Sequence, residues 1–151
     1  MERLKNYNTL SAVLGAFTHQ SLFRMTRTMA EAADAQRKLE TMRQKVDSRN
    51  NYREYRALIE AAVPPAIPFM GVLRKDLIYI DEGNTDWVGP EGELVNWEKR
   101  EMLASVARQV QRFQGTPYTF PEVHRLRLPL LLMPGALSDE ALLRVSLERE
   151  P

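Results

Sequence analysis

Apolar residues recur every three or four positions along most of this 151-residue chain. In the first segment, one face of a helix is marked by Leu10, Val13, Leu14 and Phe17. The same period returns over residues 69–80 and again over residues 102–113. No segment shows the sustained apolar-polar alternation of a half-buried strand. The pattern therefore predicts an all-α fold.

Residues with special backbone preferences mark the ends of the predicted helices. Gly83 follows the 69–82 segment, where the last residue of a helix is expected to be left-handed. Residues 84–93 contain glycine and proline and are expected to form a loop. Asn96 is the predicted N-cap of the next helix, which Gly115 and Pro117 end.

Three further segments complete the helical pattern. Residues 30–46 are rich in good helix formers but have only a thin apolar stripe, which predicts a solvated helix. The polar residues 47–51 predict a turn. Ser138 is the predicted cap of a last short helix.

Charge and cysteine content exclude several classes of function. The net charge is +1, with 21 basic and 20 acidic residues, so there is no basic surface typical of nucleic-acid binding. The chain has no cysteine, which excludes disulfides, thiolate catalysis and cysteine zinc sites. We therefore expect no nucleic-acid partner.

No segment is predicted to direct the chain into a membrane. Residues 1–10 are polar and lack the apolar core of a signal peptide. The most apolar stretch, residues 128–137, is interrupted by Pro129 and Pro134 and has about half of the roughly 20 residues that a spanning helix needs. We expect a cytoplasmic domain without direct membrane insertion.

Enzymatic constellations are missing from the sequence. His19 and His124 are far apart and lack a nearby acidic metal-ligand pattern, and there is no phosphate-binding glycine loop or nucleophile elbow. The acidic run 81–86 does not fit a calcium loop, which needs glycine at its sixth position and glutamate at its twelfth. We expect no metal site, no cofactor and no bond-making chemistry.

One pair of residues suggests a different activity. Ile78 and Glu82 are four residues apart, so they share one face of the 69–82 helix. An exposed apolar side chain beside a carboxylate could disturb a magnesium-phosphate site, because the apolar group offers the metal no ligand and the acid repels phosphate.

Collinear motifs along nearly the whole chain strengthen this interpretation. They are Asn6-Tyr7-Asn8-Thr9-Leu10, Tyr55-Arg56, residues 64–72, Lys75-Asp76-Leu77, Asp81-Glu82-Gly83-Asn84, residues 94–100, residues 111–114 with Pro117-Tyr118, and residues 146–151. Together they resemble the catalytic domain of Ras-type guanine nucleotide exchange factors, of the Son-of-sevenless type. The resemblance identifies residues 1–151 as a partial domain, its C-terminal portion.

The resemblance implies an irregular helical domain with a protruding helical hairpin over about residues 68–114. In this family the hairpin wedges between switch I of a small GTPase and its nucleotide. Ile78 falls at the apolar position that occludes the magnesium site. Glu82 falls at the acid that competes with the α-phosphate and meets a hydroxyl of the phosphate-binding loop.

The resemblance also implies residues that bind the GTPase. Phe69 and Tyr52 fall at positions that form a pocket for a tyrosine of switch II. Lys75 lies at a hairpin position that touches the GTPase, and Asn84 belongs to the family's glycine-asparagine pair. Thr18 stands where many members have an asparagine near the GTPase.

The resulting hypothesis is an exchange factor for a Ras-family GTPase of Ras, Rap or Ral type, recruited to the inner face of membranes by its GTPase or by other domains. It would catalyse nucleotide exchange without chemistry on bonds. The alternatives are an exchange-inactive helical module that binds a GTPase or serves as a scaffold, and an unrelated helical scaffold.

Overall fold

The structure is a computed structural model that describes residues 2–133 and 135–151. Met1 and Pro134 lie outside the described residues, as does the side chain of His124. Met1 begins the segment expected to be polar, Pro134 is the second proline of the apolar stretch, and His124 is one of the two histidines considered for a metal site.

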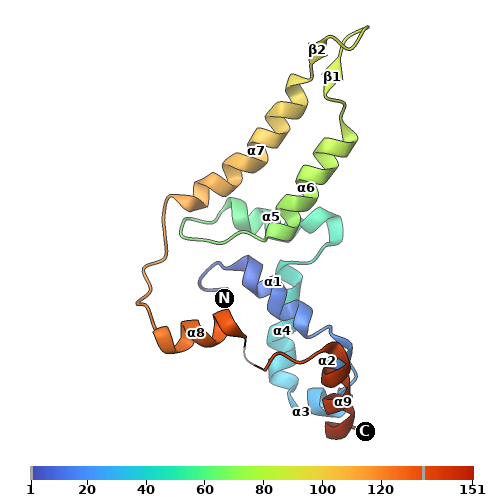
Figure 1. The fold of residues 1–151 in the computed structure, drawn as a ribbon, viewed down its shortest axis with the longest axis vertical. Helices are drawn as coiled ribbons and strands as arrows, with labels where there is room; N and C mark the ends of the chain where they lie inside the picture. The colour runs from blue at the N-terminus through green and yellow to red at the C-terminus, as the bar shows by residue number, and fades with distance from the viewer. Residues whose placement is uncertain (1, 134) are drawn as a thin grey trace. The chain divides into compact units, whose positions relative to one another are not determined.

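Helices make up most of the described residues, so the predicted all-α class is confirmed (Figure 1). In chain order the elements are α1 (Tyr7–Ala16), α2 (Gln20–Phe23), α3 (Thr26–Glu31), α4 (Ala33–Lys45), α5 (Arg49–Glu60), α6 (Met70–Gly83), β1 (Trp87–Val88), β2 (Leu94–Val95), α7 (Trp97–Gln114), α8 (His124–Leu132) and α9 (Asp139–Arg149).

The predicted loop over residues 84–93 is only partly irregular. Strands β1 and β2 pair antiparallel, with Trp87 opposite Val95 and Val88 opposite Leu94. Each strand has two residues, which is too short to produce a recognisable alternation in the sequence. The turn between the strands places Gly89 and Gly92 at positive φ, 98° and 69°, which glycine adopts without steric cost.

Two predicted boundaries are wrong. Gly83 is the last residue of α6 but is not left-handed, and the chain leaves the helix through Asn84 in an extended conformation with φ −135°. The expected helix over residues 30–46 is divided between α3 and α4, with a non-helical residue at Ala32. The predicted caps of α7 and α9 are confirmed, because Asn96 accepts the Lys99 N–H and Ser138 accepts the Ala141 N–H.

The chain divides into two compact units. Unit 1 comprises the described residues up to Ser11 together with Lys45–Pro117. Unit 2 comprises Ala12–Gln44 and the described residues from Tyr118 onward.

The core of unit 1 is built where α5 meets α6 and the end of α7. Its buried side chains include Tyr55, Ile59, Val72, Leu73 and Phe113. Each apolar side chain of this size stabilises the fold by about 1.5–3 kcal/mol when it leaves water. This core therefore stabilises the region from which the two long helices, α6 and α7, extend.

Polar contacts fix both long helices to α5. The Arg112 guanidinium at the end of α7 donates to the carbonyls of Glu60 at 3.0 Å and Ala62 at 2.7 Å. Arg56 of α5 binds both carboxylate oxygens of Asp76 on α6, at 2.8 Å and 2.6 Å. Two parallel N–H···O bonds of this kind define direction as well as distance.

In unit 2, buried and part-buried polar contacts join α2 to α9. The Ser146 hydroxyl on α9 donates to the Ser21 carbonyl on α2 at 2.5 Å, and Arg24 donates to the Ser146 carbonyl at 3.0 Å. The Glu150 carboxylate accepts the backbone N–H groups of Arg27 and Thr28 at 2.8 Å and 3.0 Å. Helix α3 has only six residues, and this carboxylate satisfies two of the backbone N–H groups at its start.

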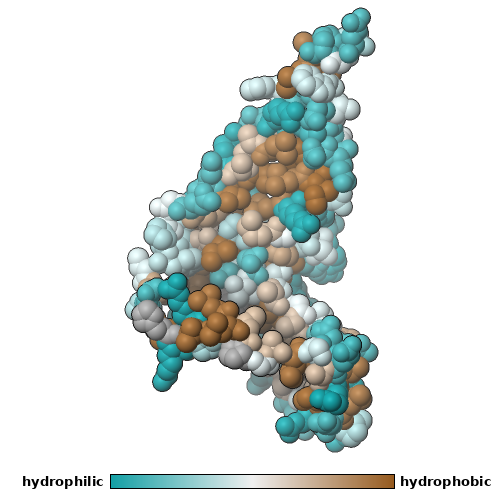
Figure 2. All heavy atoms as spheres, in the orientation of Figure 1, coloured by the Kyte–Doolittle hydropathy of each residue, from teal (hydrophilic) through white to brown (hydrophobic). Residues whose placement is uncertain are grey.

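Helix α8 has the most exposed apolar surface of unit 2, seen as a brown area over this helix in Figure 2. None of the helices in the described ranges is long and apolar enough to cross a bilayer.

Candidate functional site

A helical hairpin dominates unit 1. Helices α6 and α7 run side by side and are joined by the β1–β2 ribbon at the end remote from α5 (Figure 1). The first helix begins after Pro68 with Phe69 as its N-cap, and the second begins after Asn96. The predicted hairpin is therefore present in the fold.

The two residues predicted to act on the nucleotide site are both exposed on α6. Ile78 retains 43% of its accessible surface, although its neighbours Val72 and Leu73 on the same helix are fully buried. Glu82 is exposed near the end of the helix. Within the described part of the chain, no hydrogen bond or ion pair engages the Glu82 side chain. Their roles in exchange stay predictions.

Tyr52 and Phe69, predicted to form one pocket, are brought together from 17 positions apart in sequence. Their ring centroids are 5.9 Å apart at an interplanar angle of 78°. Phe69 also contacts Tyr55 edge-on at 6.1 Å, and its backbone N–H donates to the Tyr55 hydroxyl at 2.8 Å. The Lys75 ammonium lies 5.4 Å from the Tyr52 ring centroid, so three of the predicted GTPase-binding residues are neighbours.

An unusual backbone conformation places Tyr52 there. Asn50, Asn51 and Tyr52 have φ values of 50°, 54° and 60°, the left-handed region that a bulky residue rarely adopts. Two side chains hold this turn. The Arg56 Nε donates to the Asn51 carbonyl at 2.8 Å, and Lys75 donates to the Asn51 side-chain oxygen at 3.2 Å. The predicted turn over residues 47–51 thus lies partly within the bounds of α5, as a left-handed segment.

Asn84 and Thr18, the remaining predicted contacts, make local hydrogen bonds. The Asn84 amide donates to the Ile80 carbonyl at 2.9 Å and is half-buried, so it closes the last turn of α6. Thr18 belongs to unit 2, where its hydroxyl donates to the Gly15 carbonyl at 2.7 Å just after α1. Thr18 is exposed.

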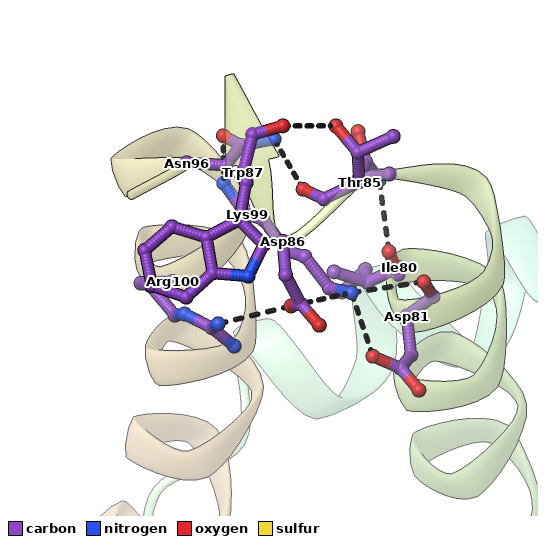
Figure 3. A network of polar contacts seen from close by, with 9 residues as sticks. Ile80, Asp81, Thr85, Asp86, Trp87, Asn96, Lys99 and Arg100 are labelled. Atoms are coloured by element: carbon purple, nitrogen blue, oxygen red, sulfur yellow. Dashed lines mark hydrogen bonds and ion pairs between the residues drawn. The ribbon is translucent and has the colours of Figure 1, made fainter. Parts of the chain in front are cut away.

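A buried lysine joins the two helices near the ribbon (Figure 3). The side chain of Lys99 is 3% exposed, and its ammonium binds the Asp81 carboxylate at 2.7 Å, the Asp81 carbonyl at 3.0 Å and the Asp86 carboxylate at 3.0 Å. Arg100 binds the same Asp86 oxygen at 2.9 Å. The Asn96 amide donates to the Thr85 carbonyl at 2.8 Å.

Ionisation in unit 1 follows these contacts. The hydrogen bond from Lys99 lowers the pKa of Asp86, and the hydrogen bond to Asp81 raises the pKa of Lys99. Hydrogen bonding to Asp76 raises the pKa of Arg56, and burial raises the pKa of Tyr55. All four groups therefore keep their ordinary charge at neutral pH.

The structure contains two sets of contacts that the sequence did not predict. The first set is formed by Lys99: this residue belongs to the 94–100 motif, but the motif did not indicate that its side chain is buried. The Arg56–Asp76 pair joins two segments whose packing was unknown. Among the described residues, no group of three or more histidine, cysteine, aspartate or glutamate side chains could hold a metal ion.

Comparison with known proteins agrees with this fold. A family model described as the RasGEF domain matches residues 1–101. The chain therefore belongs to the RasGEF domain family, which confirms the resemblance found in its motifs.

Curated relatives carry names of the same class. Ras guanine nucleotide exchange factor A of Dictyostelium discoideum is 29% identical over 163 residues, covering 100% of this chain and 27% of that protein. Ras guanine nucleotide exchange factor I of the same organism is 34% identical over 127 residues, covering 83% and 15%. Ras-specific guanine nucleotide-releasing factor 1 of Homo sapiens is 28% identical over 149 residues, covering 98% and 12%. The chain thus spans between 12% and 27% of the length of these relatives.

Proposed function

We propose that this chain promotes the release of GDP from a Ras-family small GTPase by inserting its α6–α7 hairpin beside the nucleotide. The proposal rests on family membership and on one observation: Ile78 and Glu82 are both exposed, one turn apart on α6. Ras, Rap and Ral types are the partners to be tested, and the GTPase would bring the chain to the inner face of a membrane.

The chemistry of the two side chains suits this task. Ile78 would occupy the space beside the magnesium ion without offering it a ligand, which weakens the bridge between metal and phosphates. Glu82 would repel phosphate and accept the hydrogen bonds that phosphate had accepted. Because its carboxylate makes no ion pair within the described residues, no internal contact has to break before it meets the GTPase.

Exchange of this kind needs no covalent step. The hairpin would bind the nucleotide-free GTPase more tightly than the loaded form, and this difference in affinity drives release. Since the chain is not consumed, it would accelerate exchange in both directions, and the cellular ratio of GTP to GDP would set the outcome.

The test is the release of a fluorescent GDP analogue from purified Ras, Rap and Ral GTPases, with the chain at catalytic concentration. Glu82→Ala should slow release by about 10- to 100-fold, because it removes a preorganised charge that would act beside the nucleotide phosphates. Glu148→Ala is the matched control, since Glu148 is an exposed glutamate inside α9. Circular dichroism should show unchanged helicity in both variants.

Two results would contradict the proposal. Equal release rates with Glu82→Ala and with the unmodified chain would remove Glu82 from the mechanism. No acceleration of any GTPase, together with binding to its nucleotide-free form, would instead identify the exchange-inactive binding module.

A further inference from the structure

Lys99 is buried at a place where its own helix gives no reason for a cation. It is the third residue of α7, and the N-terminus of a helix favours negative rather than positive charge. Burial of an ammonium group is unfavourable unless it is paired and hydrogen-bonded. The position of Lys99 must therefore be explained by what it contacts on α6.

All three N–H donors of the lysine have an acceptor. One acceptor is the Asp81 carbonyl, and the other two are carboxylate oxygens of Asp81 and Asp86 (Figure 3). Asp81 lies in the last turn of α6, and Asp86 precedes β1. One side chain from α7 thus fixes both the end of α6 and the start of the ribbon.

The last turn of α6 needs such a partner. The final four carbonyl groups of a helix have no N–H donor within the helix. The partial negative charge at the C-terminal end also disfavours acidic side chains there. Here the last turn has no basic residue but contains Asp81 and Glu82. Lys99 satisfies the Asp81 carbonyl, while the Asn84 amide satisfies that of Ile80.

Glu82 follows Asp81 directly, so whatever orients this turn also orients Glu82. Lys99 binds the carboxylates of Asp81 and Asp86, and Arg100 also binds that of Asp86, whereas the exposed Glu82 side chain has no such partner within the described residues. Without Lys99, a loosened turn would let Glu82 sample other directions and would add the repulsion of the unpaired Asp81 carboxylate, while Asp86 would keep its contact with Arg100.

We propose that Lys99 is a positioning residue for exchange: from α7 it holds the last turn of α6, and so keeps Glu82 in the direction in which it meets the GTPase. This inference rests on the proposed exchange function, and it adds a residue that does not itself touch the nucleotide site.

The test combines kinetics with a local measure of order in the full chain. Lys99→Met removes the charge but keeps the length of the side chain, Lys99→Arg keeps the charge, and Lys38→Met is the control on the exposed face of α4. Lys99→Met should slow GDP release at least about tenfold, since a displacement of about 1 Å can cost on the order of 100-fold. Lys99→Arg should recover part of the rate, and Lys38→Met should match the unmodified chain.

A double-substitution cycle separates positioning from a general loss of structure. If Lys99 acts through Glu82, adding Lys99→Met to Glu82→Ala should slow release little further, because the two effects are not additive. Hydrogen exchange should become faster at residues 80–86 and stay unchanged in α5.

The outcomes are distinguishable. An unmodified chain that accelerates no GTPase overturns the proposed function, and this role of Lys99 with it. An active chain whose Lys99→Met variant is equally active overturns the role of Lys99 alone. Additive effects in the cycle, or faster hydrogen exchange in α5 as well, would make Lys99 a general stabilising residue and would also overturn the proposal.

Discussion

Substitution of Tyr55 by phenylalanine tests how the pocket at the base of the hairpin is held. The Tyr55 ring is 1% exposed and contacts Tyr7 at 5.6 Å and Phe69 at 6.1 Å between centroids. Its hydroxyl accepts the backbone N–H of Phe69 at 2.8 Å. Phenylalanine keeps both ring contacts and removes this one acceptor.

The loss leaves the Phe69 N–H without its partner at the start of α6. A part-buried donor left in this state costs about 1–2 kcal/mol of the free energy of unfolding. With a denaturant slope of about 2 kcal/mol/M, the midpoint of urea unfolding should fall by about 0.5–1 M. The packing energy of the ring does not enter this difference, because the ring is retained.

The assay is urea unfolding at pH 7 followed by circular dichroism, with Tyr79→Phe as the matched control. Tyr79 is 62% exposed, so loss of its hydroxyl should change the free energy of unfolding by less than about 0.5 kcal/mol. Equal midpoints for the two variants would refute the reasoning, since the buried hydrogen bond would then contribute nothing.

The difference in free energy of unfolding between the unmodified chain and Tyr55→Phe should also depend on pH. Burial raises the pKa of Tyr55, so the native state keeps a proton that the unfolded state releases near its ordinary pKa of about 10. This contribution to stability is fully present below that pH and is lost as the pH rises from there through the raised pKa of the folded state. The difference between the unmodified chain and Tyr55→Phe should therefore narrow from pH 8 to pH 10.5. A constant difference would count against burial as the cause.

Two further predictions concern other contacts. Tyr52→Gly should change the free energy of unfolding by less than about 1 kcal/mol, because relief of a left-handed tyrosine offsets the lost ring contact with Phe69. The affinity of the Tyr52→Gly variant for a nucleotide-free GTPase should nevertheless fall, as measured by a fluorescence titration. Unchanged affinity would exclude Tyr52 from the pocket expected to bind the switch II tyrosine. Glu150→Gln should lower the melting temperature at pH 7, and the difference should disappear as the pH falls toward 3. The reason is that hydrogen bonds from the backbone of Thr28 and then Arg27 lower the pKa of Glu150, so its stabilisation is present above the ordinary glutamate pKa and is lost on acidification. Equal melting temperatures at pH 7 would contradict this.

The helices could be predicted because their signals are local. The apolar period and the caps at Asn96 and Ser138 depend on residues a few positions apart, and the structure has both caps where they were expected. Spacing alone predicted that Ile78 and Glu82 share one face of α6, but it did not predict that Ile78 is exposed. Its proposed role in exchange came from the resemblance to a family, which no periodicity could have supplied.

The contacts between segments could not be predicted in this way. The Arg56–Asp76 pair and the Lys99 contacts join residues that only the packing of helices brings together. The left-handed turn at Tyr52 depends on hydrogen bonds from Arg56 and Lys75 to Asn51, and its polar sequence indicated only a turn. Strands of two residues are below the length at which alternation is visible.

The hairpin also shows why its two helices must form together. Helix α6 ends in acids, with no basic residue in its last turn, and α7 has a buried lysine in its first turn. The acids at the end of α6 and the lysine at the start of α7 are each of the charge that the dipole of their own helix disfavours at that end. Packed antiparallel, the cation of one helix meets the acids and carbonyl of the other, so two local penalties become one stabilising contact. Because Glu82 lies beside that contact, the orientation of the proposed exchange residue depends on the integrity of the whole hairpin rather than on α6 alone.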